Sequence, residues 1–306
     1  MSETEVPWTG AAQAPIPPRE LIERTDAPRG RGDRSFRQFY EDSGRVRKAG
    51  IIDVLPDDYS FEGRRVLEFG CGSGRILRQF LPDTVLGEFW GCDLHAPTIA
   101  WLQQHLSPPL HFYVNDRIPM PQPDEHFDLV YAISVFTHIS QEWSAWLLEL
   151  HRVLKPDGLL LATFVGPEAW ERSLSSPPDE NGLGMCVQRL DQGLGDTSGP
   201  RVLHSPWWLR SHWGRAFEIL SLESFGFAGG HPSQGYILGR KRSVSLTRED
   251  VEGPDPQDPR EFVAQRQQLV VLQEEAAEIR RGYEASLSWR VTRPLRAAGR
   301  MLRSFR

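Results

Sequence analysis

The sequence predicts an α/β fold built on a doubly wound, mostly parallel sheet with helices on both faces. Short apolar strand segments alternate with helical segments between residues 65 and 165, and this alternation is typical of successive βαβ units. The segment Phe127–Val135 is apolar almost throughout, as expected for a central strand that is covered on both faces. With 306 residues, of which 39% are hydrophobic, the chain can bury a sizeable core.

The elements follow one another in a regular order. A helical segment at 35–55 comes first, and we expect Gly44 to break it because glycine is a poor helix former. The last helix of the alternation, 141–154, is amphipathic and should end at Lys155-Pro156-Asp157-Gly158. The other expected helices are 75–80 and 98–105, and the expected strands are 65–69, 90–93, 110–114, 127–135, 159–165, 217–222 and 235–240, the last two as a closing antiparallel pair.

Composition divides the chain into a central domain and flanking segments. Proline and glycine are frequent in the first 33 residues, glycine, proline and serine in 166–206, and proline again in 243–260. The expected divisions are a disordered tail at 1–33, a domain at 34–242 with an irregular lid over 166–206, a linker at 243–260, and a charged helix with a basic tail at 261–306. The helix at 261–281 has the spacing of a short coiled coil, which predicts self-association.

Charge and cysteine content exclude several classes of protein. Lys plus Arg number 35 and Asp plus Glu 41, so the net charge of -6 argues against nucleic acid as a partner. The three cysteines are far apart, which argues against a disulfide framework and predicts no metal site. No apolar run is long enough to span a membrane and no signal sequence opens the chain, so a cytoplasmic location is expected.

The most informative motif is the run Glu68-Phe69-Gly70-Cys71-Gly72-Ser73-Gly74, which links an expected strand to an expected helix. Alternate glycines let the backbone approach a ligand closely, and a helix N-terminus favours polar ligands. The acid Glu68 would repel a pyrophosphate but suits a ligand with an amine and a sulfonium. The third glycine also comes one residue too early for the dinucleotide pattern, which weighs against a nicotinamide oxidoreductase. Cys71 is expected to be a small filler rather than a nucleophile.

Two polar positions follow the next strands. Asp93, with Leu94 after it, ends the second strand, where an acid in a doubly wound fold accepts hydrogen bonds from ribose hydroxyls. Asn115 and Asp116 follow the third strand and could meet an adenine edge. An N-cap role for Asp93 and an Asx turn at Asn115 are the structural alternatives.

Four motifs in this order resemble those of class I S-adenosylmethionine-dependent methyltransferases. They are the Glu68–Gly74 run, Asp93, Phe127-Asp128-Leu129-Val130, and His151–Gly158, and the resemblance covers about residues 36–241. It implies a Rossmann-like, seven-stranded sheet and S-adenosylmethionine as cofactor. By the same resemblance the residues that would contact the cofactor are Glu68, Gly70, Cys71, Gly72, Gly74, Asp93, Leu94, Asn115, Asp116, Ala132, Ile133 and Ser134, with Tyr40 and Arg45 closing over it.

Histidine is the usual general base if the methyl acceptor is a hydroxyl. His138 follows the fourth strand in a stretch similar to one found in many bacterial methyltransferases, and it is the first candidate. His204 and His231 lie in the irregular half that would form the acceptor side. A structural role as a hydrogen-bonded loop histidine remains the alternative for His138.

The tail Ser288-Trp289-Arg290-x-Thr292-Arg293-Pro294-Leu295-Arg296 resembles the tails of bacterial glycosyltransferases and methyltransferases of cell-surface polysaccharide assembly. Residues 290–306 carry six arginines and no acid, among several apolar residues. Such a segment suits an anionic membrane surface, so 288–306 predicts peripheral contact at the inner face of the membrane.

These observations predict a methyltransferase that modifies an oxygen, with a sugar hydroxyl of a glycan as the expected acceptor. An enzyme acting on the oxygen or nitrogen of a small secondary metabolite is the neighbouring alternative. A non-catalytic scaffold that recruits partners through its C-terminal helix is the alternative from another class. The intact glycine run, Glu68 and Asp93 weigh against the scaffold, because a retired site has no physical need of them.

Overall fold

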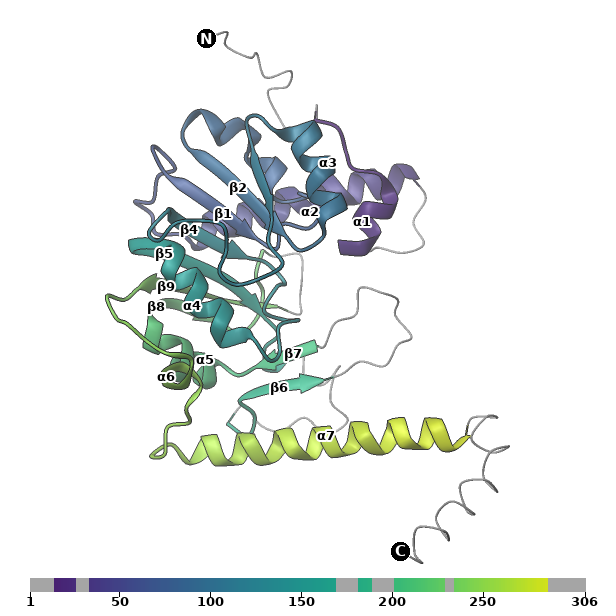
Figure 1. Cartoon of the computed structure of the whole chain (residues 1–306), viewed down its shortest axis with the longest axis vertical. Coiled ribbons are helices and arrows are strands. Elements are labelled where there is room, and N and C mark those ends of the chain that lie inside the picture. The colour runs from purple at the N-terminus through teal and green to yellow at the C-terminus, as the bar shows by residue number, and fades with distance from the viewer. Residues whose placement is uncertain (1–13, 26–32, 169–180, 189–200, 229–233, 286–306) are drawn as a thin grey trace, which may run out of the picture.

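The computed structural model describes residues 14–25, 33–168, 181–188, 201–228 and 234–285. Its centre is a seven-stranded sheet in the order β3-β2-β1-β4-β5-β9-β8, in which β9 runs antiparallel to the other six strands (Figure 1). The strands are β1 (Arg65–Phe69), β2 (Glu88–Asp93), β3 (His111–Val114), β4 (Phe127–Ala132), β5 (Leu154–Phe164), β8 (Phe217–Glu223) and β9 (Gly235–Lys241). The predicted doubly wound sheet and its closing antiparallel pair are therefore confirmed.

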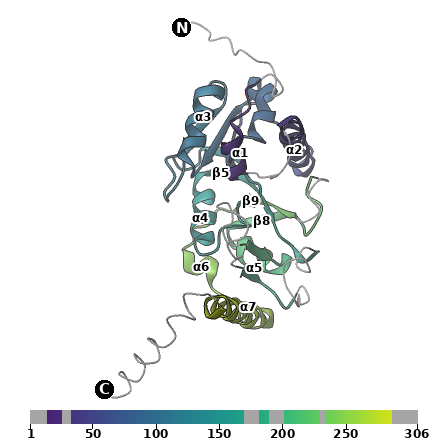
Figure 2. The same cartoon turned by 90° about the vertical axis from the view of Figure 1, so that its right-hand side faces the viewer.

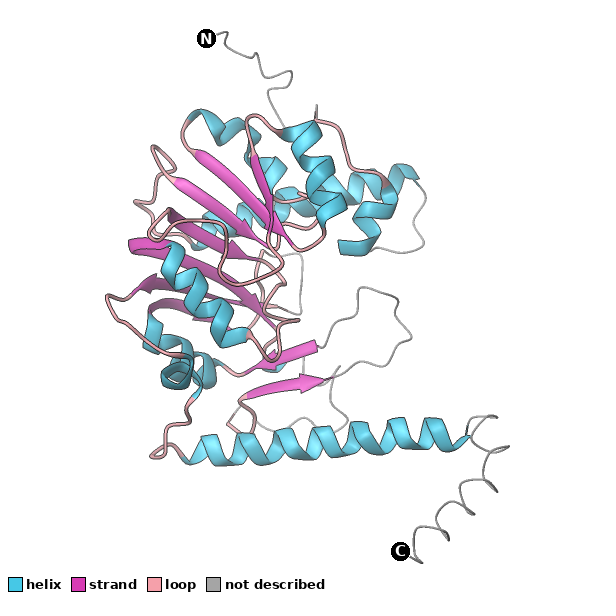
Figure 3. Cartoon of the chain, viewed as in Figure 1, coloured by secondary structure: helices cyan, strands magenta, loops and turns pink. Residues whose placement is uncertain are grey.

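Helices cover both faces of the sheet (Figure 3). One face packs against α2 (Asp33–Val54), the 3₁₀ helix η1 (Leu77–Val85) and α3 (Ala96–Leu106). The other packs against α4 (Trp143–Val153), α5 (Pro206–Ala216) and the short helix α6 (Arg248–Glu252). Neighbouring residues of β1 show the alternation that this requires, because Val66 packs on the first face and Leu67 on the second.

The sheet brings the predicted site residues to one edge. β1, β2 and β4 are parallel, and their register places Phe69 beside Cys92 and Glu68 beside Tyr131. The chain leaves all three strands at their carboxyl ends, where doubly wound folds bind their ligands. The glycine loop, Asp93 and the loop after β4 are therefore neighbours.

Helix α2 is continuous through Gly44, so the expected break is wrong. A Cβ atom at this position would lie 2.3 Å from the carbonyl oxygen of Arg75. The glycine is therefore required by the close packing of α2 on the segment after the glycine loop. Close tertiary packing outweighs the modest helix penalty of glycine, which is about 1 kcal/mol.

Two segments expected to lack structure contain packed helices. Within the N-terminal 33 residues, α1 (Arg19–Thr25) forms, and Ile22 is 1% exposed. Within the expected linker, Thr247 and Asp250 form a reciprocal capping box at the start of α6, and Val251 is fully buried. Both segments are parts of the folded body in the range that the structure describes.

The expected irregular lid contains a two-stranded antiparallel sheet, β6 (Met185–Gln188) with β7 (Arg201–His204), followed directly by α5. The long helix α7 (Pro259–Ala285) lies beside β6, as Figure 1 shows, and Figure 2 shows it below α5 and α6. The side-chain amide of Gln268 pairs with the backbone N–H and carbonyl of Val187, which joins α7 to this small sheet. The predicted charged helix is confirmed and begins at Pro259.

None of the helices in the described ranges combines the length and the apolarity that crossing a membrane requires. The basic tail 288–306 lies outside the described residues, and so does His231. The predicted membrane contact of the tail therefore stays a prediction.

Candidate active site

The glycine loop after β1 has the backbone of a ligand cradle. Gly70, Gly72 and Gly74 have φ angles of 75°, 51° and 74°, which side-chain-bearing residues rarely adopt. A Cβ atom on Gly70 would lie 2.5 Å from Cγ2 of Val135, and one on Gly74 would lie 2.7 Å from Cδ2 of Leu102. The loop thus needs glycine both for its conformation and for close contact with the loop after β4 and with α3.

Asp93 at the end of β2 holds this loop in place. Its Oδ2 accepts a hydrogen bond from the N–H of Gly72 at 2.9 Å, and its Oδ1 accepts one from the N–H of His95 at 2.9 Å. Cys92 contributes its carbonyl oxygen to the N–H groups of Gly70 and Cys71. A carboxylate has about four acceptor positions, so Asp93 can keep both bonds and still accept from ribose hydroxyls.

Helix α2 supports the loop from behind. The hydroxyl of Tyr40 donates to the carbonyl oxygen of Ser73 at 2.8 Å, and the Tyr40 side chain is buried. Arg75 donates to the hydroxyl of Ser43 at 2.8 Å. Arg45 was expected to close over the cofactor, but its side chain is 67% exposed and pairs with Asp42 on the same helix. Tyr40 thus positions the loop, and the structure gives Arg45 no comparable contact.

Two acidic groups make the cradle electrostatically negative. Glu68 is 3% exposed and accepts a hydrogen bond from the hydroxyl of Tyr131 at 3.3 Å. Burial raises the pKa of the Cys71 thiol well above its usual value, and the nearby carboxylates of Asp93 and Glu68 raise it further. A cation is therefore favoured at this loop, and the protonated Cys71 thiol is a poor nucleophile.

The side of the cradle that was expected to meet adenine offers an exposed apolar group and an unused acceptor. Leu94, next to Asp93, is 74% exposed. The Oδ1 atom of Asn115 is buried and has no hydrogen-bond partner among the described residues. Asp116 is exposed beside it. An apolar face with buried and exposed acceptors matches the chemistry of an adenine ring with its amino group, so the residues present fit the cofactor.

The end of β4 forms the wall next to the glycine loop. Ala132 and Ile133 are buried, and Ser134 has a φ angle of 61°, an uncommon value for a residue with a side chain. The Ser134 N–H donates to Oγ1 of Thr163 at 2.7 Å, while its hydroxyl bonds to the Gln234 side chain. Ser134 thus ties the loop after β4 to the segment before β9, and the strained backbone is of a kind that clusters at functional sites.

The candidate bases lie in very different surroundings. His138 is exposed on the loop after β4. Its backbone N–H donates to the carbonyl oxygen of Val135, the residue that touches Gly70. His204 is 1% exposed on β7, and burial lowers its pKa to about 3. A general base works best with a pKa near the working pH, so the lowered pKa of His204 makes it a poor base. Within the described ranges, no group of acidic, histidine and cysteine residues could hold a metal ion.

Asp128 has a structural role that the sequence motif does not reveal. Burial alone would raise its pKa, but hydrogen bonds from the Arg65 N–H, Lys155 and Arg64 lower it below its usual value. These partners tie β4 to the starts of β1 and β5, at the edge opposite the glycine loop. The sequence signal for this structural role is that charged residues flank the apolar strands.

The fold is similar to that of a solved S-adenosylmethionine dependent methyltransferase, and part of the chain matches a methyltransferase family. Residues 67–162 match the family described as "Methyltransferase domain". The chain is similar to a solved S-adenosylmethionine dependent methyltransferase from Mesorhizobium loti, with a TM-score of 0.51 and 16% identity over 65% of this chain and 99% of that one. This second likeness concerns the fold alone.

Two curated relatives are similar in sequence. "Fatty-acid O-methyltransferase" of Mycolicibacterium smegmatis is 35% identical over 137 residues, which cover 42% of this chain and 47% of the relative. "Phthiotriol/phenolphthiotriol dimycocerosates methyltransferase" of Mycobacterium tuberculosis is 30% identical over 184 residues, which cover 58% of this chain and 62% of the relative. The matches thus span about half to three fifths of these relatives. The names of these two relatives refer to a fatty acid and to phthiotriol dimycocerosates, so the association with polysaccharide assembly stays a prediction.

Proposed function

We propose that the protein transfers the methyl group of S-adenosylmethionine to an oxygen atom of its acceptor. The observation that carries this proposal is the meeting of the glycine cradle with two carboxylates, Glu68 and Asp93, at one edge of the sheet. When bound, S-adenosylmethionine supplies a methyl group on a positively charged sulfur, which is already a good leaving group. The protein therefore has mainly to align the reactants, which can contribute on the order of 7–11 kcal/mol.

Each residue of the cradle has a distinct part in this proposal. Asp93 holds the ribose hydroxyls while it braces Gly72, and Glu68 provides the negative charge near the methionine portion. Leu94 and Asn115 receive the adenine ring. The segment Ala132–Ser134 forms the wall beside the glycine loop.

His138 is the proposed general base. It is exposed, so an acceptor can reach it, and its loop contacts the glycine loop through Val135. Removing a proton from a hydroxyl acceptor would contribute roughly 100- to 10,000-fold to the rate. A change of His138 to alanine should therefore lower kcat strongly and leave cofactor affinity unchanged.

The acceptor class follows from the relatives rather than from the cradle. The names of both curated relatives refer to a fatty acid or to a lipid, so we propose an acceptor with a long apolar part. A sugar hydroxyl is the second candidate, and the similarity of residues 288–296 to tails of polysaccharide-assembly enzymes favours it. A lipid-linked sugar would satisfy both observations.

The deciding experiment is calorimetric titration of the full chain with S-adenosylmethionine and S-adenosylhomocysteine, with NADH as the control. Micromolar binding of the two sulfur compounds and none of NADH is expected. If neither sulfur compound binds, the proposal fails and the non-catalytic scaffold becomes the better description. Methyl transfer to fatty acids and to sugars, measured with a radiolabelled methyl group, then separates the two acceptor classes.

A further inference from the structure

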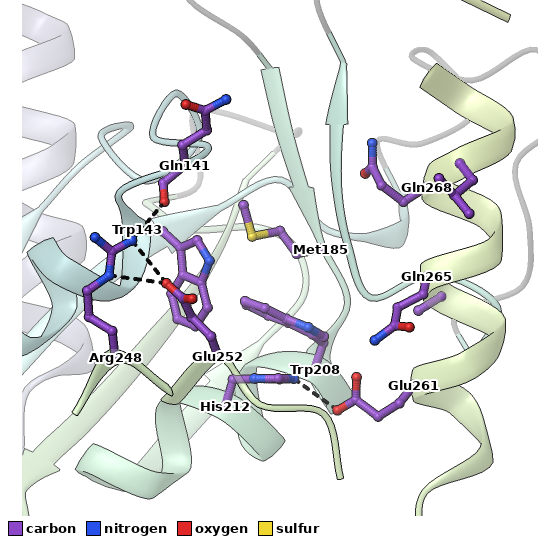
Figure 4. A pocket seen from close by; sticks show the side chains of 12 residues that line it. Gln141, Trp143, Met185, Trp208, His212, Arg248, Glu252, Glu261, Gln265 and Gln268 are labelled. Carbon is purple, nitrogen blue, oxygen red and sulfur yellow. Dashed lines mark hydrogen bonds and ion pairs between the residues drawn. The ribbon is translucent and has the colours of Figure 1, made fainter. Parts of the chain in front are cut away.

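A second cavity lies between helix α7 and the body of the protein, outside the cofactor cradle (Figure 4). Its volume is about 570 Å³, within the ~300–1,000 Å³ typical of small-ligand sites. The side chains that line it come from the start of α4, from β6, α5 and α6, and from one side of α7. They are Gln141, Trp143, Met185, Trp208, His212, Arg248, Glu252, Glu261, Ala264, Gln265, Gln268 and Leu269.

The charged groups of this cavity are already paired with protein groups. Arg248 bonds to Glu252 at 3.1 Å and to Glu142 at 2.9 Å. The two ring nitrogens of His212 face the Val251 carbonyl oxygen at 2.7 Å and a Glu261 carboxylate oxygen at 2.9 Å. A charged or strongly polar ligand would have to break these bonds, and each group left unpaired costs about 1–3 kcal/mol.

Two of the three glutamine side chains that line the cavity are not available to a ligand. Gln268 is held by the backbone of Val187. Gln141 turns its side-chain amide away from the two tryptophans, while its backbone carbonyl oxygen accepts a hydrogen bond from Arg248 (Figure 4). This leaves Gln265 as a lining side chain that makes no hydrogen bond with another described residue. One amide is too little to recognise the many hydroxyls of a glycan.

The surface that remains for a ligand is apolar. It consists of the rings of Trp143 and Trp208, which are 7% and 6% exposed, the flexible thioether of Met185, and Ala264 and Leu269 on α7. Leu269 lines the cavity and is 59% exposed, so a ligand bound there could cover it. Apolar contact is thus the main source of affinity that the cavity offers.

A peptide is a poor match for this lining. An extended peptide would bring backbone groups that need hydrogen bonds, and the polar lining groups are mostly occupied. A hydrocarbon chain needs neither.

We propose that this cavity binds the hydrocarbon chain of the methyl acceptor. The inference rests on the proposed function and gives its acceptor a location. The loop after β4 connects the two sites, because Val135 contacts Gly70 in the cradle and Gln141 and Trp143 line the cavity. An acceptor lying along this loop can present its oxygen near His138 with its chain under α7.

The test is calorimetric titration of the full chain with straight-chain carboxylates of increasing length, below their micelle concentrations. Hexanoate and dodecanoate share one head group, so a difference between them reports the chain alone. Transfer of one methylene from water is equivalent to about fourfold in affinity, and we expect dodecanoate to bind at least tenfold more tightly. Equal affinity for the two acids would overturn the proposal.

Variants on α7 locate the binding. Leu269→Gln should weaken dodecanoate binding fivefold or more, and Gln265→Leu should strengthen it. Phe262→Gln is the matched control, since Phe262 is 74% exposed on the same helix and does not line the cavity. An unchanged affinity in Leu269→Gln, or an equal loss in Phe262→Gln, would place the chain elsewhere.

A parallel titration with maltotriose separates the chain from a glycan. Maltotriose binding that Gln265→Leu abolishes would overturn the proposal in favour of a saccharide site. Titration of every variant with S-adenosylmethionine keeps the two proposals apart, because none of these residues belongs to the cradle. Normal cofactor binding without any dodecanoate binding would refute the cavity assignment alone.

Discussion

At the scale of single residues, Asp93 has both a structural role and a proposed role in cofactor binding. It braces the glycine loop through Gly72, and it is the proposed ligand of the ribose. Asp93→Ala should weaken S-adenosylmethionine binding by about 1–3 kcal/mol, which is roughly 5- to 150-fold, because it removes hydrogen bonds to a charged group. Calorimetry measures this affinity directly.

Glu68→Gln should weaken binding through charge alone, since it keeps the size of the side chain. Asp57→Ala is the control, because Asp57 is an exposed acid outside the cradle. Unchanged affinity in both Asp93→Ala and Glu68→Gln would refute the assignment of the cofactor site.

His204 should make the protein sensitive to acid. Its folded pKa is lowered to about 3 by burial, whereas an unfolded histidine titrates near 6.5. Between these values the unfolded chain binds more protons, so the free energy of unfolding should fall as the pH drops below about 6.5. The slope from this group is at most about 1.4 kcal/mol per pH unit.

Urea unfolding of the wild type and of His204→Phe between pH 7 and pH 4 isolates this effect. The variant should lose stability less steeply on the acid side, by up to one proton in the slope. Other histidines whose pKa is lowered by desolvation, such as the half-buried His151, contribute equally to both proteins. Parallel curves for the two proteins would show that His204 is not buried in its neutral form.

At the scale of secondary structure elements, the contact between α2 and the segment after the glycine loop is the most sensitive to volume. Gly44→Ala places a Cβ atom 2.3 Å from the Arg75 carbonyl oxygen, so the backbone must move. We expect a loss of about 1–3 kcal/mol of unfolding free energy, although alanine favours helices. Thermal unfolding is a sufficient measurement.

Gly214→Ala on α5 is the matched control for that substitution. A Cβ atom there meets nothing closer than 3.9 Å, at Cγ1 of Ile219. Alanine should be neutral or stabilise α5 by up to about 1 kcal/mol, because only helix propensity changes. Equal destabilisation of both variants would mean that Gly44 is not a packing glycine.

The same elements show what the sequence could predict. Five of the seven strands of the large sheet were predicted within two residues of both ends, because buried strands appear as apolar runs. The ends of the other two were further off: β4 ends at Ala132, three residues before the predicted end, and β5 begins at Leu154, five residues before the predicted start. The continuity of α2 could not be predicted, since it depends on how closely Gly44 approaches a segment 31 residues later. Helix α6 had a local signal in Thr247 and Asp250, which the surrounding prolines obscured.

The candidate site shows the same difference between local features, which the sequence predicts, and contacts between distant segments, which it does not. Glycine and acid spacing indicated the cradle, because these residues act through local backbone geometry and strand ends. The support of the loop by Tyr40, the partner of Ser134 in Gln234 and the cavity under α7 arise only when distant segments meet. No periodicity in the sequence records such contacts.

At the scale of the whole molecule, the basic tail can be tested apart from the domain. Deletion of residues 288–306 removes six arginines and should reduce binding to vesicles that contain anionic phosphatidylglycerol. The loss should shrink at high salt, because surface electrostatics are screened, and cofactor affinity should stay the same. Equal vesicle binding with and without the tail would end the membrane hypothesis.

The N-terminal segment is bound to the body through one fully buried cation. Arg78 donates to the carbonyl oxygens of Ala14 and Pro15, at 2.7 and 2.9 Å, and pairs with Glu41. A truncated chain that starts at residue 34 would leave this guanidinium with fewer partners in a dry environment. Such a chain should unfold at a lower temperature and bind S-adenosylmethionine more weakly, as scanning calorimetry with and without cofactor would show.

Arg78→Met, made in both the full and the truncated chain, separates the effect of the charge from that of the missing segment. If the truncated chain is as stable as the full one, the contact with Ala14 and Pro15 has no energetic weight. If Arg78→Met restores stability to the truncated chain, the buried charge is the cause. A chain cut back to the domain predicted from the sequence therefore loses a segment that contacts a buried charge. Protection from proteases near residue 14 should report whether the cofactor loop is ordered.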